Sequence, residues 1–77
     1  MRTIDKLTAI YDRWESTRYY YQQQKRSYNN FKEFGMYDSA NIYSEYMVTT
    51  RKRIRHLQAL YFEVLKDLNN EIRENEV

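Results

Sequence analysis

FGMYDS, residues 34–39, is the only stretch of this 77-residue chain that predicts a break in helical structure. It contains the single glycine of the sequence, Gly35, and the chain has no proline. Gly35 can take the left-handed conformation that ends a helix, with Met36 packing back on Phe31 as in a Schellman motif. Asp38 is a candidate N-cap for a following helix. We therefore expect the chain to bend here and to continue as a second helix.

The apolar and aromatic residues on both sides of the bend recur at the spacing of a helix rather than of a strand. Before the bend they are Leu7, Ile10, Trp14, Tyr21, Tyr28 and Phe31, with Ile4 and Tyr11 widening the stripe. After the bend they are Tyr43, Met47, Ile54, Leu57, Tyr61, Val64 and Leu68, with Tyr46, Leu60, Leu65 and Ile72 beside them. The period of about 3.5 residues is typical of helices that pack as a coiled coil. The sequence predicts one domain, 1–77, with helices over about 4–34 and about 39–74 and a turn at 35–38.

The composition limits how such a hairpin is stabilised. One core in a chain of 77 residues contributes no more than about 3 to 5 kcal/mol. The absence of cysteine and the single histidine argue against disulfides and metal sites as further sources of stability, which leaves self-association. The expected fold is all-α, an antiparallel two-helix hairpin that pairs into a four-helix homodimer. Polar Gln24 and Thr50 interrupt the predicted seam, as residues that set the register of a helical assembly do.

Two stretches without any acidic residue, 16–32 and 46–62, carry eight of the thirteen Lys and Arg and six of the nine Tyr. A hairpin bent at Gly35 lays these stretches side by side. The sequence thus predicts a basic, tyrosine-rich belt around the middle of the molecule, and a belt without internal counter-charges indicates binding to another molecule. The belt residues that we expect to contact a partner are Arg18, Tyr19, Tyr20, Lys25, Arg26, Tyr46, Arg51, Lys52 and Arg55.

Two structural explanations compete with a binding role for the belt. A run of charges on a helix is commonly only a solvated face. Tyrosines that lie off the main apolar stripes would equally be buried by a second hairpin. The three tyrosines at 19–21 span about 200° of a helix circumference, so at least one of them points away from the seam.

The two ends of the predicted hairpin carry opposite charges. The net charge is only +2, but the last sixteen residues are rich in Asp and Glu. Folding the chain about residue 36 or 37 sets Lys6 near Asp67 and Arg2 near Glu71. We therefore expect charge pairing at the open end of the hairpin, and an unneutralised basic middle.

The sequence offers little support for catalysis or for a cofactor. His56 faces Ser16 and Thr17 in the hairpin register, but no carboxylate is placed to orient its imidazole, as a catalytic triad requires. The acidic ladder within 63–71 is better explained by ion pairs with the first helix than by a metal site. One glycine is too few for a phosphate-cradling loop. We expect no enzyme activity, no metal and no cofactor.

The sequence favours the function of a small binding protein that docks the belt onto a macromolecule and regulates or inhibits that macromolecule, as phage and mobile-element inhibitors do. The expected partners are a second copy of the chain and a protein, either acidic or involved in nucleic-acid processing. The alternatives are direct binding of RNA or DNA by a dimeric hairpin, and a structural connector in a larger assembly. Without a secretion signal, a membrane span or cysteine, the sequence predicts a cytoplasmic protein.

Overall fold

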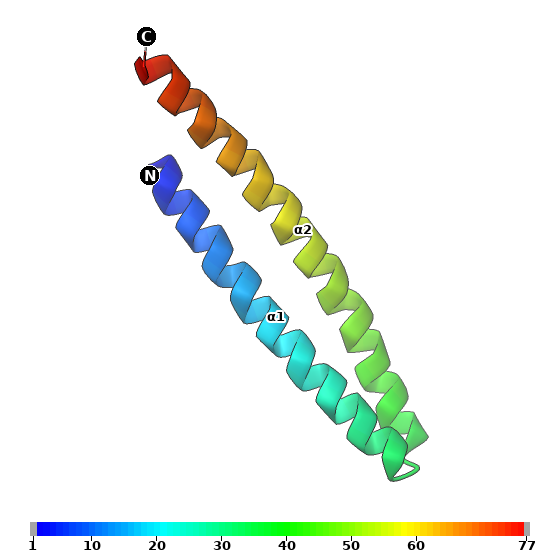
Figure 1. The fold of residues 1–77 in the computed structure, drawn as a ribbon. Coiled ribbons are helices and arrows are strands. Elements are labelled where there is room, and N and C mark those ends of the chain that lie inside the picture. The colour runs from blue at the N-terminus through cyan, green and yellow to red at the C-terminus, as the bar shows by residue number, and fades with distance from the viewer. Residues whose placement is uncertain (1, 77) are drawn as a thin grey trace.

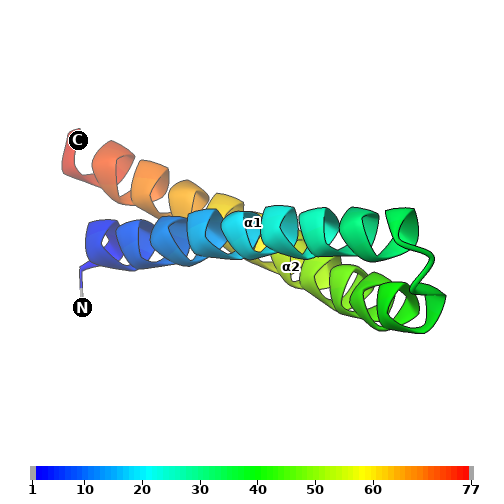
Figure 2. The ribbon, with the colours of Figure 1, turned by 90° about the horizontal axis from the view of Figure 1, so that it is seen from below.

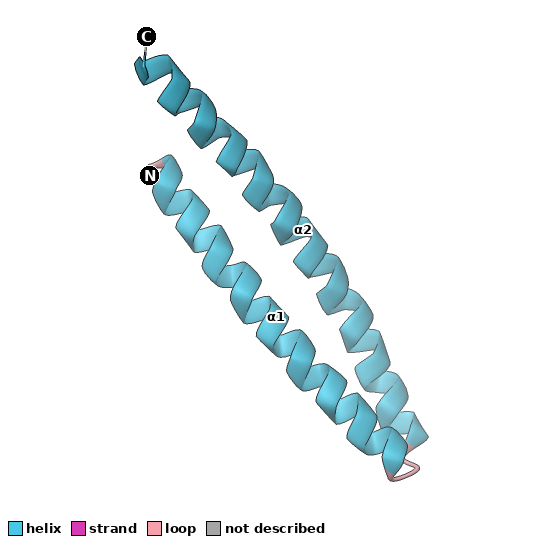
Figure 3. Cartoon of the chain, in the orientation of Figure 1, coloured by secondary structure: helices cyan, strands magenta, loops and turns pink. Residues whose placement is uncertain are grey.

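The computed structural model describes residues 2–76 of the chain. This part folds into two helices, α1 (Thr3–Glu33) and α2 (Tyr37–Glu76), and contains no strand. Figure 1 shows α1 and α2 side by side, with the start of α1 and the end of α2 at the same end of a long rod. A single short loop joins the helices (Figure 3), and the rod measures 64 × 16 × 14 Å. The predicted all-α hairpin of two long helices is confirmed.

A Schellman motif ends α1. Gly35 has a φ of +74°, and its N–H donates to the carbonyl of Lys32 at 3.2 Å. The N–H of Met36 donates to the carbonyl of Phe31 at 2.8 Å. These two bonds satisfy carbonyl groups that a helix otherwise leaves free at its end. The chain can therefore reverse within a few residues.

The start of α2 differs from the sequence prediction. The helix begins at Tyr37 rather than at about 39, because the N–H of Ala40 already donates to the carbonyl of Met36 at 3.0 Å. Asp38 thus lies inside the first turn of α2, and its prediction as an N-cap is wrong. A carboxylate in this turn still interacts favourably with the positive end of the helix dipole. The turn is correspondingly shorter than predicted and spans 34–36.

The two helices meet along the predicted heptad seam. Every residue at the centre of the two predicted stripes is buried or half-buried. Of the residues predicted to widen the stripes, Leu60 and Leu65 are half-buried, whereas Ile4, Tyr11, Tyr46 and Ile72 are exposed. Leu7 is the most covered large side chain, and aromatic pairs bridge the helices elsewhere. The ring centroids of Trp14 and Tyr61 lie 5.6 Å apart, and those of Phe31 and Tyr43 lie 5.5 Å apart. Figure 2 shows α1 and α2 crossing at a shallow angle, as the heptad spacing requires.

The hairpin buries little of its solvent-accessible surface. It exposes 6468 Å², whereas a compact protein of 9.6 kDa exposes about 5,100 Å². The difference of about 1,400 Å² reflects the rod shape, which gives one helix pair no third element to pack against. Twelve large apolar or aromatic side chains expose 46% or more of their surface. They are Ile4, Tyr11, Tyr19, Tyr20, Phe34, Met36, Tyr37, Ile42, Tyr46, Val48, Phe62 and Ile72.

At the open end of the hairpin, charges gather as predicted but do not form the predicted ion pairs. Lys6 and Asp67 line one surface hollow together with Thr3 and Glu71. Glu71 accepts a hydrogen bond from the hydroxyl of Thr3 at 2.6 Å instead of pairing with Arg2. Neither Lys6 with Asp67 nor Arg2 with Glu71 is an ion pair in the described part of the chain. Exposed long side chains gain too little from pairing to hold one geometry.

Candidate interaction surface

All nine belt residues are exposed. Among the three consecutive tyrosines, Tyr19 and Tyr20 each expose 64% of their surface, whereas Tyr21 is half-buried in the seam. Tyr46 of α2 is 53% exposed. The expectation that at least one tyrosine of this run points away from α2 is confirmed.

The belt divides between two sides of the hairpin. Residues seven positions apart lie on the same side of a helix in a coiled coil. In α1, Arg18 and Lys25 therefore form one row, and Arg13 and Tyr20 form another. Because Arg18 and Tyr20 are two positions apart, about 200° around the helix, the two rows flank the seam on opposite sides.

One side of the hairpin combines tyrosines with arginines. Tyr46 and Arg53 form a row on α2, and Arg53 lines a surface hollow together with Arg13 of α1. The row of Arg13 and Tyr20 thus lies on the same side as the row of Tyr46 and Arg53. Tyr19 adjoins them, with its ring 6.4 Å from that of Tyr20. We name this surface, formed by Arg13, Tyr19, Tyr20, Tyr46 and Arg53, the tyrosine side.

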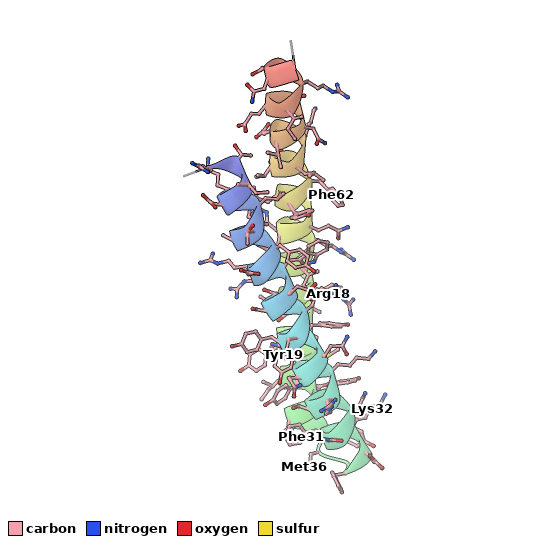
Figure 4. The ribbon with its side chains drawn as sticks, turned by 60° about the vertical axis from the view of Figure 1, so that its left-hand side comes forward. Arg18, Tyr19, Phe31, Lys32, Met36 and Phe62 are labelled. Carbon is pink, nitrogen blue, oxygen red and sulfur yellow. The ribbon has the colours of Figure 1, made fainter. Side chains whose placement is uncertain are left out.

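The opposite surface, which we name the basic side, consists of Arg18, Lys25, Lys32, Arg51 and Arg55. Figure 4 shows Arg18 and Lys32 on the side of the hairpin away from Tyr19. Arg51 Nη2 donates to the hydroxyl of Tyr21 at 2.9 Å, and its guanidinium lies 5.6 Å from the centre of that ring. This contact holds Arg51 against the seam. Lysine and arginine, but no belt tyrosine, make up this side.

Two predicted contact residues belong to neither side. Arg26 and Lys52 occupy the heptad position farthest from the seam, so both lie on the outward faces of their helices. Both side chains are exposed. Tyr19 occupies the same position as Arg26 but joins the tyrosine side through its contact with the Tyr20 ring. Arg26 and Lys52 add positive charge to the belt, but they lie apart from the rows of residues that flank the seam.

Acidic groups neutralise little of the belt. Arg18 Nη1 donates to Glu15 Oε1 at 3.1 Å, and this is the only ion pair between described residues. The two side chains are 59% and 48% exposed, and exposed pairs of this kind contribute between 0 and about 1 kcal/mol. The remaining basic groups of the belt thus keep charge that no intramolecular pair offsets.

Reasoning from the sequence missed two arginines of the tyrosine side, Arg13 and Arg53. Arg13 lies outside the acid-free stretch 16–32, whereas Arg53 lies within 46–62 but was not selected among the basic residues of that stretch. Heptad spacing would have identified both, since Arg13 precedes Tyr20 by seven positions and Arg53 follows Tyr46 by seven.

Comparison of the chain with protein-family models, with curated proteins and with solved structures found no match. Within the described residues, neither helix has a stretch that is apolar and long enough to cross a membrane. Residues 2–76 also hold no cluster of three or more His, Asp or Glu side chains suited to a metal ion. The surfaces that remain as candidate binding sites are the two sides of the hairpin and the hollow between its helices.

Proposed function

We propose that this chain is a non-enzymatic binding protein that docks its belt onto a macromolecular partner and regulates or inhibits that partner. The observation that carries the proposal is the exposed belt, in which a single ion pair, between Arg18 and Glu15, offsets any charge within the described residues. Exposed aromatic side chains and unpaired charges are available to another molecule. Their burial and pairing in a complex would lower the free energy of that complex.

The partner that suits both sides is an acidic protein. Tyrosine and arginine together are enriched among the residues that dominate protein interfaces, and the tyrosine side offers both. The basic side supplies charge that accelerates the encounter with an acidic surface. We propose that the complex forms in the cytoplasm and that its target is an enzyme of nucleic-acid processing, as for phage and mobile-element inhibitors.

Direct binding of nucleic acid is the second candidate, and one observation favours it. Arg18, Lys25 and Lys32 form a row with a spacing of about 10 Å, at 1.5 Å per residue. The aromatic rings next to these cations belong to Tyr21 and Tyr28, which are half-buried in the seam and already lie against Arg51 and Lys32. Binding of single strands needs aromatic side chains in the same groove as the cations, for stacking on bases. The basic side therefore suits the phosphate backbone of a duplex, held by charge alone.

We further propose that two antiparallel hairpins pair into a four-helix homodimer. The excess surface of about 1,400 Å² is larger than the roughly 800 Å² that each partner buries in a standard interface. Four of the twelve exposed apolar residues, Ile4, Tyr11, Phe62 and Ile72, lie toward the open end, where the rows of the basic side turn apolar. The Tyr61 ring lies 6.1 Å from that of Tyr11 and 5.7 Å from that of Phe62. Ile4 and Ile72 continue the same rows by heptad spacing.

The test of the proposed function is a pull-down from bacterial lysate with the purified chain, with and without nuclease and at two salt concentrations. Retention of a discrete protein after nuclease and at high salt is the expected result, because aromatic anchors resist salt. Recovery of nucleic acid alone, lost at high salt, would support the second candidate and overturn the first. The mass of the free protein is measured in the same experiment.

A further inference from the structure

A surface hollow of about 430 Å³ lies between α1 and α2 on the tyrosine side of the hairpin. Arg13 and Ser16 of α1 line it, together with Arg53 and His56 of α2. Leu57 and Leu60, both half-buried, add apolar surface. The sequence predicted that His56 faces Ser16. Arg13 and Arg53 add positive charge and hydrogen-bond donors to this site.

The charges around this hollow all have the same sign. Its lining contains two guanidinium groups and an imidazole but no carboxylate, whereas the hollow at the open end of the hairpin includes Asp67 and Glu71. Neither Arg13 nor Arg53 has an ion-pair partner among the described residues. Positive charges that lie close together in one hollow repel each other when the hollow is empty. A bound anion offsets this repulsion and lowers the electrostatic energy.

The donors fit a phosphate group better than a carboxylate. Guanidinium groups bind phosphate oxygens in a bidentate manner, and two arginines from different helices approach the anion from both walls. A phosphate monoester carries close to two negative charges and three terminal oxygens, so it can use both arginines and a third donor. The Ser16 hydroxyl can be that donor, because it makes no hydrogen bond to another described residue, whereas Thr17 donates to the carbonyl of Arg13.

We propose that this hollow binds a phosphate monoester that carries an apolar substituent. The phosphate lies between Arg13 and Arg53, and the substituent rests on Leu57 and Leu60. A phosphodiester has one negative charge and two free oxygens, so it leaves part of this donor set unused. None of these four residues belongs to the nine belt residues, but Arg13 and Arg53 also lie on the tyrosine side, so phosphate binding and partner binding are measured separately.

The experiment titrates the full chain with phenyl phosphate at constant ionic strength, with chloride as the ionic control. Isothermal titration calorimetry measures the binding, because Trp14, the only tryptophan of the chain, packs on Tyr11 and Tyr61 and does not line the hollow. We expect saturable binding to the wild-type protein. Dimethyl phosphate, a diester, serves as the second probe, and we expect it to bind at least about tenfold more weakly because it engages fewer charged donors.

The double variant Arg13→Gln/Arg53→Gln should lose about tenfold or more in affinity for phenyl phosphate, the cost of charged hydrogen bonds. The double variant Arg2→Gln/Arg73→Gln removes the same charge from exposed positions outside both the hollow and the belt, and it should bind as the wild type does. Circular dichroism checks that both variants keep their helices. Equal losses in the two variants, or no saturable binding to the wild type, would overturn the proposal. Equal affinity for the two probes would also overturn it and point to a nucleic-acid backbone.

Discussion

Gly35 supports the turn through its backbone conformation and not through close packing. Its φ is +74°, and a Cβ added there would meet no atom within 4 Å. Gly35→Ala should therefore lower the free energy of unfolding by about 1 to 2 kcal/mol, the cost of a left-handed alanine. Urea unfolding measures this loss. Gly35→Asn should cost less, since asparagine tolerates the left-handed region, and an equal loss would mean that packing matters instead.

Gln24 is a polar residue in the seam with an unsatisfied oxygen. Its Oε1 is buried without a hydrogen-bond partner, and the side chain is half-buried. Gln24→Leu should therefore raise the free energy of unfolding by about 1 kcal/mol, because the desolvation penalty disappears. Gln22→Leu, at an exposed position, is the matched control and should change little. A loss of stability in Gln24→Leu would mean that this amide makes a necessary contact in the assembled protein.

The seam could be predicted residue by residue, whereas the polar contacts could not. Apolar side chains at heptad spacing must face the partner helix, so every residue at the centre of the predicted stripes is at least half-buried. Asp38 failed as an N-cap because helix ends shift by one or two residues at little cost. The ion pairs of Lys6 and Arg2 failed because flexible exposed side chains have several conformations of similar energy.

At the scale of elements, the pairing of α1 with α2 depends on few well-covered side chains. Leu7 is 8% exposed and is the only buried residue of α1. Leu7→Ala should lower the free energy of unfolding by about 2 kcal/mol, the lower end for a buried leucine, because the hairpin is thin. Thr8→Ala is the exposed neighbour control. Hydrogen exchange of the first turns of α1 should accelerate in Leu7→Ala and not in the control, and equal exchange would refute this role.

The division of the belt is also a property of the elements. The sequence indicated which stretches lack acidic residues, and these stretches do lie side by side. The acid-free stretches did not indicate on which side of the seam each side chain lies, since Arg18 and Tyr20 are close in the sequence but lie on opposite sides. The side of the helix is given by the heptad position of a residue and not by the stretch that contains it. The tyrosine side and the basic side therefore emerge only when both helices are placed against each other.

At the scale of the whole molecule, the exposed apolar surface predicts self-association. The free protein should have twice the 9.6 kDa mass of one chain, and its melting temperature should rise with concentration. Phe62→Glu, at a residue 54% exposed near the open end, should shift the mass to that of one chain. Phe34→Glu is the control, because Phe34 is 77% exposed but lies at the turn. Sedimentation equilibrium measures the masses, and a monomeric wild-type protein would contradict the homodimer.

The proposed functions use parts of the molecule that overlap in one place. The apolar rows near the open end are proposed for pairing, the belt for a partner and the hollow for a phosphate. Because Arg13 and Arg53 line the hollow and also belong to the tyrosine side, substitutions there should affect both phosphate and partner binding, whereas a substitution at Phe62 should affect neither.

The central claim, that the belt is the contact surface for a partner, is tested most directly by charge reversal on α2. Arg51→Glu/Arg55→Glu reverses two charges of the basic side, and Lys66→Glu/Arg73→Glu makes the same change in net charge outside the belt. All four side chains are exposed, so both variants should keep their helices and their mass. Pull-downs at equal protein concentration should show the partner lost with the first variant and retained with the second. Retention of the partner by both variants would contradict the claim and leave the belt a solvated surface.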